Sequence, residues 1–227
     1  MMKKTLILNA VVVGTLSSGF AMAAVEGLSA NAGVVSDYYF RGVQQTSSAS
    51  ANGGIDYEHK SGFSAGIWAA DVEGQNGGLT GTNPPQGIEI DTYASFAGEA
   101  GKIGYNIGYT HYGYTGDFDT SYDEVNLGAS YGDFALDVAS GSHEVPGGID
   151  EDYTFTSISY GAGPLSVTYG SWGNDFAGAY LEVGLSTDIG GAEAGVSFIN
   201  GDPDDGVNNI MTDGTALVFS ISKSFDL

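Results

Sequence analysis

The stretch KIGYNIGYTHYGY, residues 102–114, decides the fold class of this chain. Its residues alternate strictly in polarity: one parity holds Ile103, Tyr105, Ile107 and Tyr109, and the other holds Lys102, Gly104, Asn106, Gly108 and Thr110. A repeat of two places successive side chains on opposite faces of a β-strand. The stretch therefore predicts a strand with one apolar and one polar face.

The same alternation recurs along the chain, with clear examples at 88–97, 121–131 and 178–187. There are 37 glycines, 14 tyrosines and 11 phenylalanines, which favour strands and turns over helices. We predict twelve strands, at residues 30–41, 48–58, 63–73, 88–97, 102–114, 121–131, 133–141, 152–160, 165–172, 178–187, 191–199 and 214–225.

The connections between these strands alternate in length. HKSG, GEAG, GD, GAGP and IGG are short, whereas EGQNGGLTGTNPPQG, TGDFDT, SHEVPGGID, GNDFAG and NGDPDDGVNNIMTD are longer and polar. Outer-membrane barrels have this rhythm, with an even number of antiparallel strands of about 9–11 residues. The alternative is a secreted β-sandwich, but an apolar parity on nearly every strand favours lipid contact. We expect an all-β, transmembrane, antiparallel up-and-down β-barrel.

The two ends of the chain suit a secreted barrel. Residues 1–23 combine a basic start, a short apolar run and the sequence Ala21-Met22-Ala23, which is typical of a cleaved signal peptide. The barrel then occupies residues 24–227. We expect the C-terminal strand to close the barrel against the first strand and to engage the barrel-assembly machinery. The expected location is the bacterial outer membrane, with outer-membrane lipid around the barrel.

The charge balance argues against nucleic acid as a partner. Without Lys3 and Lys4, four of the 6 basic residues remain against 28 acidic ones. Such a surface does not bind nucleic acid, because phosphate contacts need Lys and Arg. There is no cysteine, so no disulfide supports the fold.

If the apolar parity faces lipid, the charged side chains of the opposite parity line the lumen. A basic group facing lipid at mid-depth would cost about 2–4 kcal/mol. The predicted lumen-lining residues are Asp37, Arg41, Asp56, Glu58, Glu89, Asp91, Lys102, Glu124, Asp137 and Glu182. Arg41 then faces carboxylates, either as an internal brace or as one side of a constriction.

Four segments carry a resemblance to a known family: SDYYFRGVQQT (36–46), GGIDYEHKSGFSAGIWAADV (53–72), IEIDTY (88–93) and SISKSF (220–225). They are similar to the TorF-type porin family of proteobacteria, whose members are outer-membrane proteins of largely unknown function. The residues that match its motifs are Ser36, Asp37, Tyr38, Phe40, Arg41, Gly42, Asp56, Tyr57, Gly62, Phe63, Gly66, Trp68, Glu89 and Asp91. The resemblance implies an outer-membrane barrel with a pore-like role.

These observations lead to the expectation of a porin-like channel for small solutes or ions. A carboxylate-lined lumen should favour cations. The alternative is a non-conducting structural or surface-interaction barrel, in which inward side chains such as Tyr39, Tyr93 and Trp172 fill the channel. The bulk across the lumen separates the two. The sequence does not decide the oligomeric state or the solute.

Catalysis and metal binding have weaker support. His111 lies on the lipid-facing parity, and its neighbours two residues away, Tyr109 and Gly113, offer no nucleophile. We therefore expect no enzyme and no cofactor. The loop NGDPDDGVNN holds three carboxylates with oxygens suited to calcium, those of Asp202, Asp204 and Asp205. Solvation of an acidic loop explains the same residues without a metal.

Overall fold

The computed structural model describes residues 27–74, 85–116, 118–203 and 210–227. The predicted signal peptide, residues 1–23, lies outside the described residues. Twelve strands form one closed barrel: β1 (Leu28–Val35), β4 (Ser50–Glu58), β5 (Phe63–Glu73), β6 (Gln86–Ala100), β7 (Ile103–Tyr114), β8 (Tyr122–Tyr131), β9 (Phe134–His143), β10 (Glu151–Ala162), β11 (Leu165–Asn174), β12 (Ala179–Ile189), β13 (Ala192–Asp202) and β14 (Gly214–Asp226).

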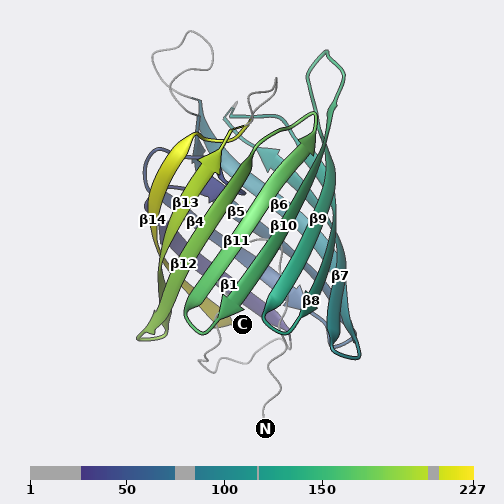
Figure 1. The fold of residues 1–227 in the computed structure, drawn as a ribbon, viewed down its shortest axis with the longest axis vertical. Helices are drawn as coiled ribbons and strands as arrows, with labels where there is room; N and C mark the ends of the chain where they lie inside the picture. Colours follow the sequence, from purple (N-terminus) through teal and green to yellow (C-terminus); the bar gives the residue numbers. More distant parts are fainter. Residues whose placement is uncertain (1–26, 75–84, 117, 204–209) are drawn as a thin grey trace.

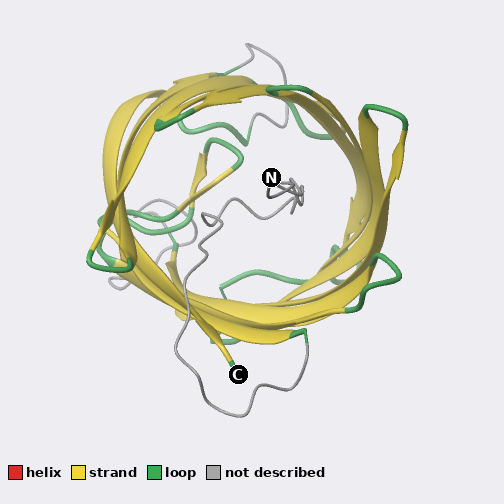
Figure 2. Cartoon of the chain, turned by 90° about the horizontal axis from the view of Figure 1, so that it is seen from below, coloured by secondary structure: helices red, strands yellow, loops and turns green. Residues whose placement is uncertain are grey.

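Every neighbouring pair in the ring is antiparallel, and β1 pairs with both β4 and β14. Figures 1 and 2 show the tilted strands and the closed ring. Closure gives each wall strand a partner on both sides, so no strand edge exposes unpaired backbone N–H and C=O groups to lipid. The predicted all-β, twelve-strand barrel is confirmed.

The connections divide the barrel into two ends. Short turns join β4–β5, β6–β7, β8–β9, β10–β11 and β12–β13 at the lower end in Figure 1, which we call the turn end. Gly101, Gly132 and Gly163 begin two-residue turns with φ of 70°, 61° and 60°, a region that glycine enters without steric cost. The longer connections lie at the opposite end, which we call the loop end.

The predicted alternation of faces is also observed on the wall strands. The outward parity is apolar and exposed, as in β7 (Ile103, Ile107), β8 (Val125, Leu127) and β12 (Leu181). The inward parity carries Glu89 and Asp91 on β6 and Glu124 on β8, each 1% exposed. Within the described residues, no helix is long and apolar enough to cross a bilayer.

One predicted strand is wrong in its second half. We expected 30–41 to run along the wall, but β1 ends at Val35, and the chain then turns into the lumen. Residues 36–49, which we call the inner hairpin, contain two short paired strands, β2 (Tyr39–Phe40) and β3 (Val43–Gln44). Figure 2 shows a short hairpin inside the ring.

The reversal between β2 and β3 has a local cause at the tip of the inner hairpin. Arg41 has a φ of 49° and Gly42 a φ of 81°, and two successive left-handed residues reverse a tight hairpin. Period-two alternation continues through Tyr39 and Phe40 on either path, so the pattern alone does not distinguish a wall strand from a hairpin. On a continued wall strand, Tyr38 and Phe40 would have the parity opposite to Asp37 and Arg41 and would face lipid; instead they contact Trp68 and Tyr112 in the lumen.

Candidate functional site

The inner hairpin places Arg41 against the wall of the barrel. Its guanidinium forms a two-pronged ion pair with Glu124 of β8, with Nη1–Oε2 and Nη2–Oε1 distances of 2.6 and 2.8 Å. The side chains of the pair are 9% and 0% exposed. Two parallel hydrogen bonds to one carboxylate form a strong and geometrically specific arrangement. Arg41 therefore ties the hairpin to the strand opposite it.

Further contacts surround this ion pair. The hydroxyl of Tyr153 donates to Glu124 Oε2 at 3.0 Å and that of Tyr112 to Oε1 at 3.3 Å. The guanidinium carbon lies 4.4 Å from the ring centre of Phe155, a distance typical of cation–π attraction. The indole of Trp172 donates to the backbone carbonyl of Arg41 at 3.2 Å. The guanidinium and the backbone carbonyl of Arg41 thus both have hydrogen-bond partners on wall strands.

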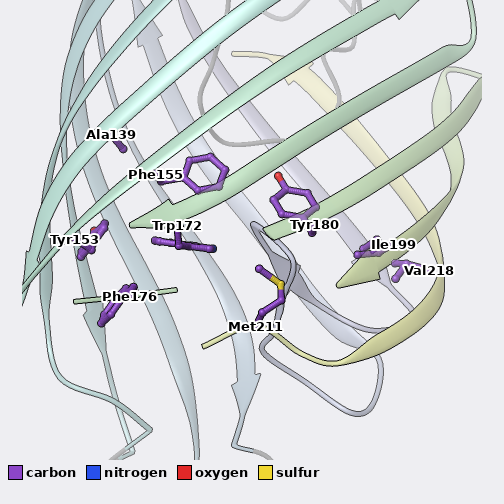
Figure 3. Close-up of a cluster of buried hydrophobic side chains, with 9 residues drawn as sticks. All are labelled: Ala139, Tyr153, Phe155, Trp172, Phe176, Tyr180, Ile199, Met211 and Val218. Atoms are coloured by element: carbon purple, nitrogen blue, oxygen red, sulfur yellow. The ribbon is translucent and has the colours of Figure 1, made fainter. Parts of the chain in front are cut away.

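Aromatic side chains fill the lumen around the hairpin. Figure 3 shows the buried cluster, which comprises Ala139, Tyr153, Phe155, Trp172, Phe176, Tyr180, Ile199, Met211 and Val218. The hairpin residues Tyr39, Phe40 and Val43 pack against it. Tyr153 and Phe176 are stacked, with centroids 5.0 Å apart. These residues come from β9 to β14 and their loops, so together with the hairpin they form a packed layer on that side of the lumen near the loop end.

The two halves of the lumen differ in burial. Inward residues toward the loop end are buried, including Trp68, Glu124 and Tyr153. Inward polar residues toward the turn end are only half-buried, including Asn31, Asp56, Ser130, Asp137, Ser159 and Ser220. The lumen is packed toward its loop end and is lined by half-buried polar side chains toward its turn end. Of the filling side chains expected from the sequence, Tyr39 and Trp172 belong to the packed half.

A second acidic group lies beside the hairpin. Glu89 and Asp91 of β6 are buried, and the Tyr38 hydroxyl donates to Glu89 Oε1 at 3.3 Å. The Tyr38 ring meets Trp68 edge-on, with centroids 5.7 Å apart. This part of the hairpin is therefore attached to β5 and β6, whereas Arg41 is attached to β8.

The remaining predicted lumen residues are dispersed. Asp56 accepts hydrogen bonds from Asn31 and Tyr93 in the turn-end half, where Asp137 is half-buried. Glu182, also half-buried, lies toward the loop end of β12, where it pairs with Ile199 of the buried cluster. Glu58 is exposed at the last position of β4. Other predicted positions differ from expectation: Asp37 precedes β2 in the inner hairpin, Arg41 forms its tip, and Lys102 is exposed in the β6–β7 turn.

A polar clasp joins the loops above the packed half. His143 at the end of β9 has one ring nitrogen 3.2 Å from Asp119 and the other 3.2 Å from Glu151, and its ring stacks on Tyr122. Burial opposes ionisation of Asp119, but hydrogen bonds from His143, Tyr122 and the Thr120 amide hold the pKa of this loop carboxyl below its ordinary value. The clasp therefore favours the charged form of Asp119.

His111 lies on the outer face, as its parity predicts. Its Nδ1 is 2.8 Å from Asp123 on β8, and the Tyr109 hydroxyl donates to the same carboxylate. The sequence alone did not indicate Asp123 as a partner of His111. The two residues are 12 positions apart in the chain and meet only because the register of β7 with β8 pairs them. Among the described residues, no hydroxyl is hydrogen-bonded to the imidazole of His111.

The predicted calcium loop is only partly covered by the structure. Asp202 is exposed at the end of β13, and Asp204 and Asp205 lie outside the described residues. Within the residues that the structure does describe, no group of three or more His, Cys, Asp and Glu side chains has an arrangement that could hold a metal ion.

Sequence reasoning missed several residues that hold the hairpin, among them Tyr38, Phe40, Tyr112 and Tyr153. Their aromatic character suited a membrane-interface belt equally well, so composition did not separate the two roles. The local signal that could have found the hairpin is Gly42 directly after Arg41, since glycine favours a reversal with positive φ.

Solved outer-membrane proteins align with most of this chain. An active-site mutant of outer membrane phospholipase A from Escherichia coli aligns with a TM-score of 0.50 at 11% identity, covering 86% of this chain and 89% of that chain. The calcium-bound phospholipase dimer of Salmonella typhi gives a TM-score of 0.49 at 12% identity, covering 86% and 90%. The outer membrane protease OmpT from Escherichia coli gives 0.27 at 13% identity, again covering 86% and 90%. At these identities the likeness concerns the fold alone.

No curated protein sequence matches the chain. A family model does match, over residues 21–225, and it is described as a bacterial protein of unknown function (Gcw_chp). The match covers the inner hairpin and the wall strands, except for the last residue of β14. The chain belongs to this bacterial family, Gcw_chp.

Proposed function

We propose that the protein is an outer-membrane β-barrel whose lumen is closed by its inner hairpin, and which does not conduct ions in this conformation. The observation that carries this proposal is the Arg41–Glu124 ion pair inside the packed loop-end half of the lumen. A hairpin held by a buried, bidentate ion pair and by aromatic packing obstructs the passage. The exposed apolar outer parity supports a bilayer as its surroundings.

A second candidate function is a cation-favouring channel that opens when the hairpin leaves the lumen. The observation that favours it is a set of lumen carboxylates that are not fully buried, Asp56 and Asp137 in the turn-end half and Glu182 beside the buried cluster. Carboxylates between low-dielectric walls concentrate cations. The motif likeness to TorF-type porins points to the same role.

The remaining parts of the proposal concern location and partners. We place the protein in the outer membrane, in contact with its lipid, after assembly by the machinery that recognises C-terminal barrel strands. We propose no catalytic role, because the outward His111 is bonded to Asp123 and, among the described residues, to no nucleophile.

Single-channel recording in planar bilayers tests the closure. Val35 of β1 pairs directly with Ser50 of β4, so residues 36–49 can be replaced by a two-residue Asn-Gly turn without altering the register. We expect no discrete steps from the parent protein and steps from this hairpinless variant. Lys102→Ala, in an exposed turn, is the matched control and should resemble the parent.

Two results would contradict the proposal. Steps of equal size from the parent and the hairpinless variant would show that the hairpin does not close the lumen. A hairpinless variant that inserts, has barrel circular dichroism and stays silent would overturn the channel candidate. For the selectivity part, a reversal potential in a salt gradient that indicates anion preference would contradict the role of Asp56, Asp137 and Glu182.

A further inference from the structure

Glu89 and Asp91 form a buried carboxyl pair that the closure of the lumen leaves unexplained. They lie two residues apart on β6, so both face inward, and each is 1% exposed. As successive inward positions of one strand, their side chains are neighbours on the lumen wall. Glu89 Oε2 and Asp91 Oδ1 have no donor among the described residues.

The groups packed around this pair do not neutralise it. The inner hairpin contributes the Tyr38 hydroxyl, and β5 contributes Trp68, which packs on Tyr38. The ionisable groups that face the pair from the other elements are Tyr112 and Tyr114 on β7, Glu124 on β8 and Asp119 in the β7–β8 loop. The acids among them add negative charge.

The nearby cation is already engaged. Arg41 forms its ion pair with Glu124, and no other described Lys or Arg forms an ion pair with Glu89 or Asp91. Two buried carboxylates at successive inward positions of one strand cannot both stay ionised without a counter-charge. A single shared proton would let one carboxyl donate to the other and would halve the buried charge.

We propose that Glu89 and Asp91 form a proton-binding site, which holds one proton between them, and that loss of this proton loosens the inner hairpin. The ligand of the site is the proton itself. A doubly ionised pair must be hydrated, and the space over Glu89 is occupied by Tyr38, so water can reach the pair only as the hairpin moves. The proton site stands on the buried pair alone, whereas its effect on conduction rests on the proposed function.

Infrared spectroscopy of the folded protein tests the proton site directly. An ordinary exposed carboxyl is about 99% or more ionised at neutral pH, so a protonated-carboxyl C=O band at that pH reports an unusual group. We expect this band in the parent and its loss in both Glu89→Gln and Asp91→Asn. Glu182→Gln, a lumen acid on the opposite wall strand β12, is the control and should keep the band.

A parent protein without the band at neutral pH would overturn the proton site, as would a band that survives in Glu89→Gln and Asp91→Asn. If the band appeared only after removal of calcium or sodium, the pair would hold a metal ion and not a proton. Because these readouts do not involve conduction, they stand or fall separately from the proposed closure.

The link to the hairpin has its own readout. When one proton is coupled to opening, the open-to-closed ratio rises by up to about tenfold per pH unit over the range in which the open state has lost the proton and the closed state still holds it. We expect this rise in single-channel open probability for the parent and a flat pH profile for Glu89→Gln, which stays neutral. A parallel rise in both proteins, or a flat profile in the parent, would overturn the coupling.

Discussion

Replacement of Arg41 by Ala is the most direct test of the internal brace. The change leaves Glu124 fully buried without its cation, and among the described residues only the Tyr112 and Tyr153 hydroxyls then donate to it. Removal of one partner from a buried ion pair costs about 3–5 kcal/mol. That figure includes the loss of the stacking on Phe155, a cation–π contact worth about 1–2 kcal/mol in a desolvated site.

The structure limits how the protein can avoid this cost. Expulsion of the hairpin would hydrate Glu124 but would also expose the apolar faces of Phe40 and Val43, which pack on the buried cluster. We therefore expect Arg41→Ala to lose stability and also to conduct intermittently. Arg41→Lys keeps the charge but not the two-pronged geometry, and it should lie between the parent and Arg41→Ala.

The assay is reversible denaturant unfolding in detergent micelles, followed by tryptophan fluorescence. The 2 tryptophans, Trp68 and Trp172, both lie in the lumen near the hairpin, so the emission reports the packed half. The double variant Arg41→Met with Glu124→Gln removes both charges and should lose at least about 2 kcal/mol less than the sum of the single variants.

The reasoning would be refuted by an Arg41→Ala protein that unfolds within about 0.5 kcal/mol of the parent and gives no channel steps. It would equally be refuted if the double variant lost the full sum of the single costs, since the two side chains would then act independently.

The remaining predictions concern the hairpin tip, the outer face and the loops. Gly42→Val should destabilise the protein by about 1–3 kcal/mol in the same unfolding assay, because a Cβ at φ of 81° would lie 2.7 Å from Tyr180. Gly101→Ala, at a φ of 70° with open space around it, should lose less, and an equal loss would exclude steric conflict as the cause. Leu127→Arg, on the outward face and 51% exposed, should cost about 2–4 kcal/mol in lipid vesicles, whereas Ser130→Arg on the lumen face should cost less. Asp119 has a lowered pKa in the folded protein. Its contribution to stability is therefore present above its pKa in the unfolded chain, about 3.9, and is lost as the pH falls through its pKa in the folded protein. Asp119→Asn should abolish this acid-dependent part of the protection of its loop against protease, and an unchanged pH profile would contradict the clasp.

The wall of the barrel follows from the sequence because its signal is local. Alternation at 102–114 assigns an outward face to Ile107 and an inward face to Asn106 without knowledge of any other strand, and the structure confirms both. The alternating lengths of the connections likewise indicated up-and-down topology, since short turns can join only neighbouring antiparallel strands. The inward positions of Glu89, Asp91 and Glu124 follow from the same parity.

The contacts inside the lumen depend on information that no local pattern contains. Arg41 and Glu124 are separated by 83 residues, and their contact requires both a closed ring and a hairpin that folds into it. His111 and Asp123 meet only through the register of β7 with β8.

By itself, the sequence determined that this chain forms a twelve-strand barrel with an apolar exterior and an acidic interior. The reason is that alternation within each strand, independent of the others, assigns its apolar side chains to lipid and its polar side chains to the lumen. Only the tertiary structure decided that Tyr38, Phe40 and Arg41 leave the wall and fill the lumen. Their burial becomes favourable only after β8, β10 and β11 have supplied Glu124, Phe155 and Trp172 as partners. An alternating pattern records which side of a strand is apolar, but it does not record what lies across the barrel.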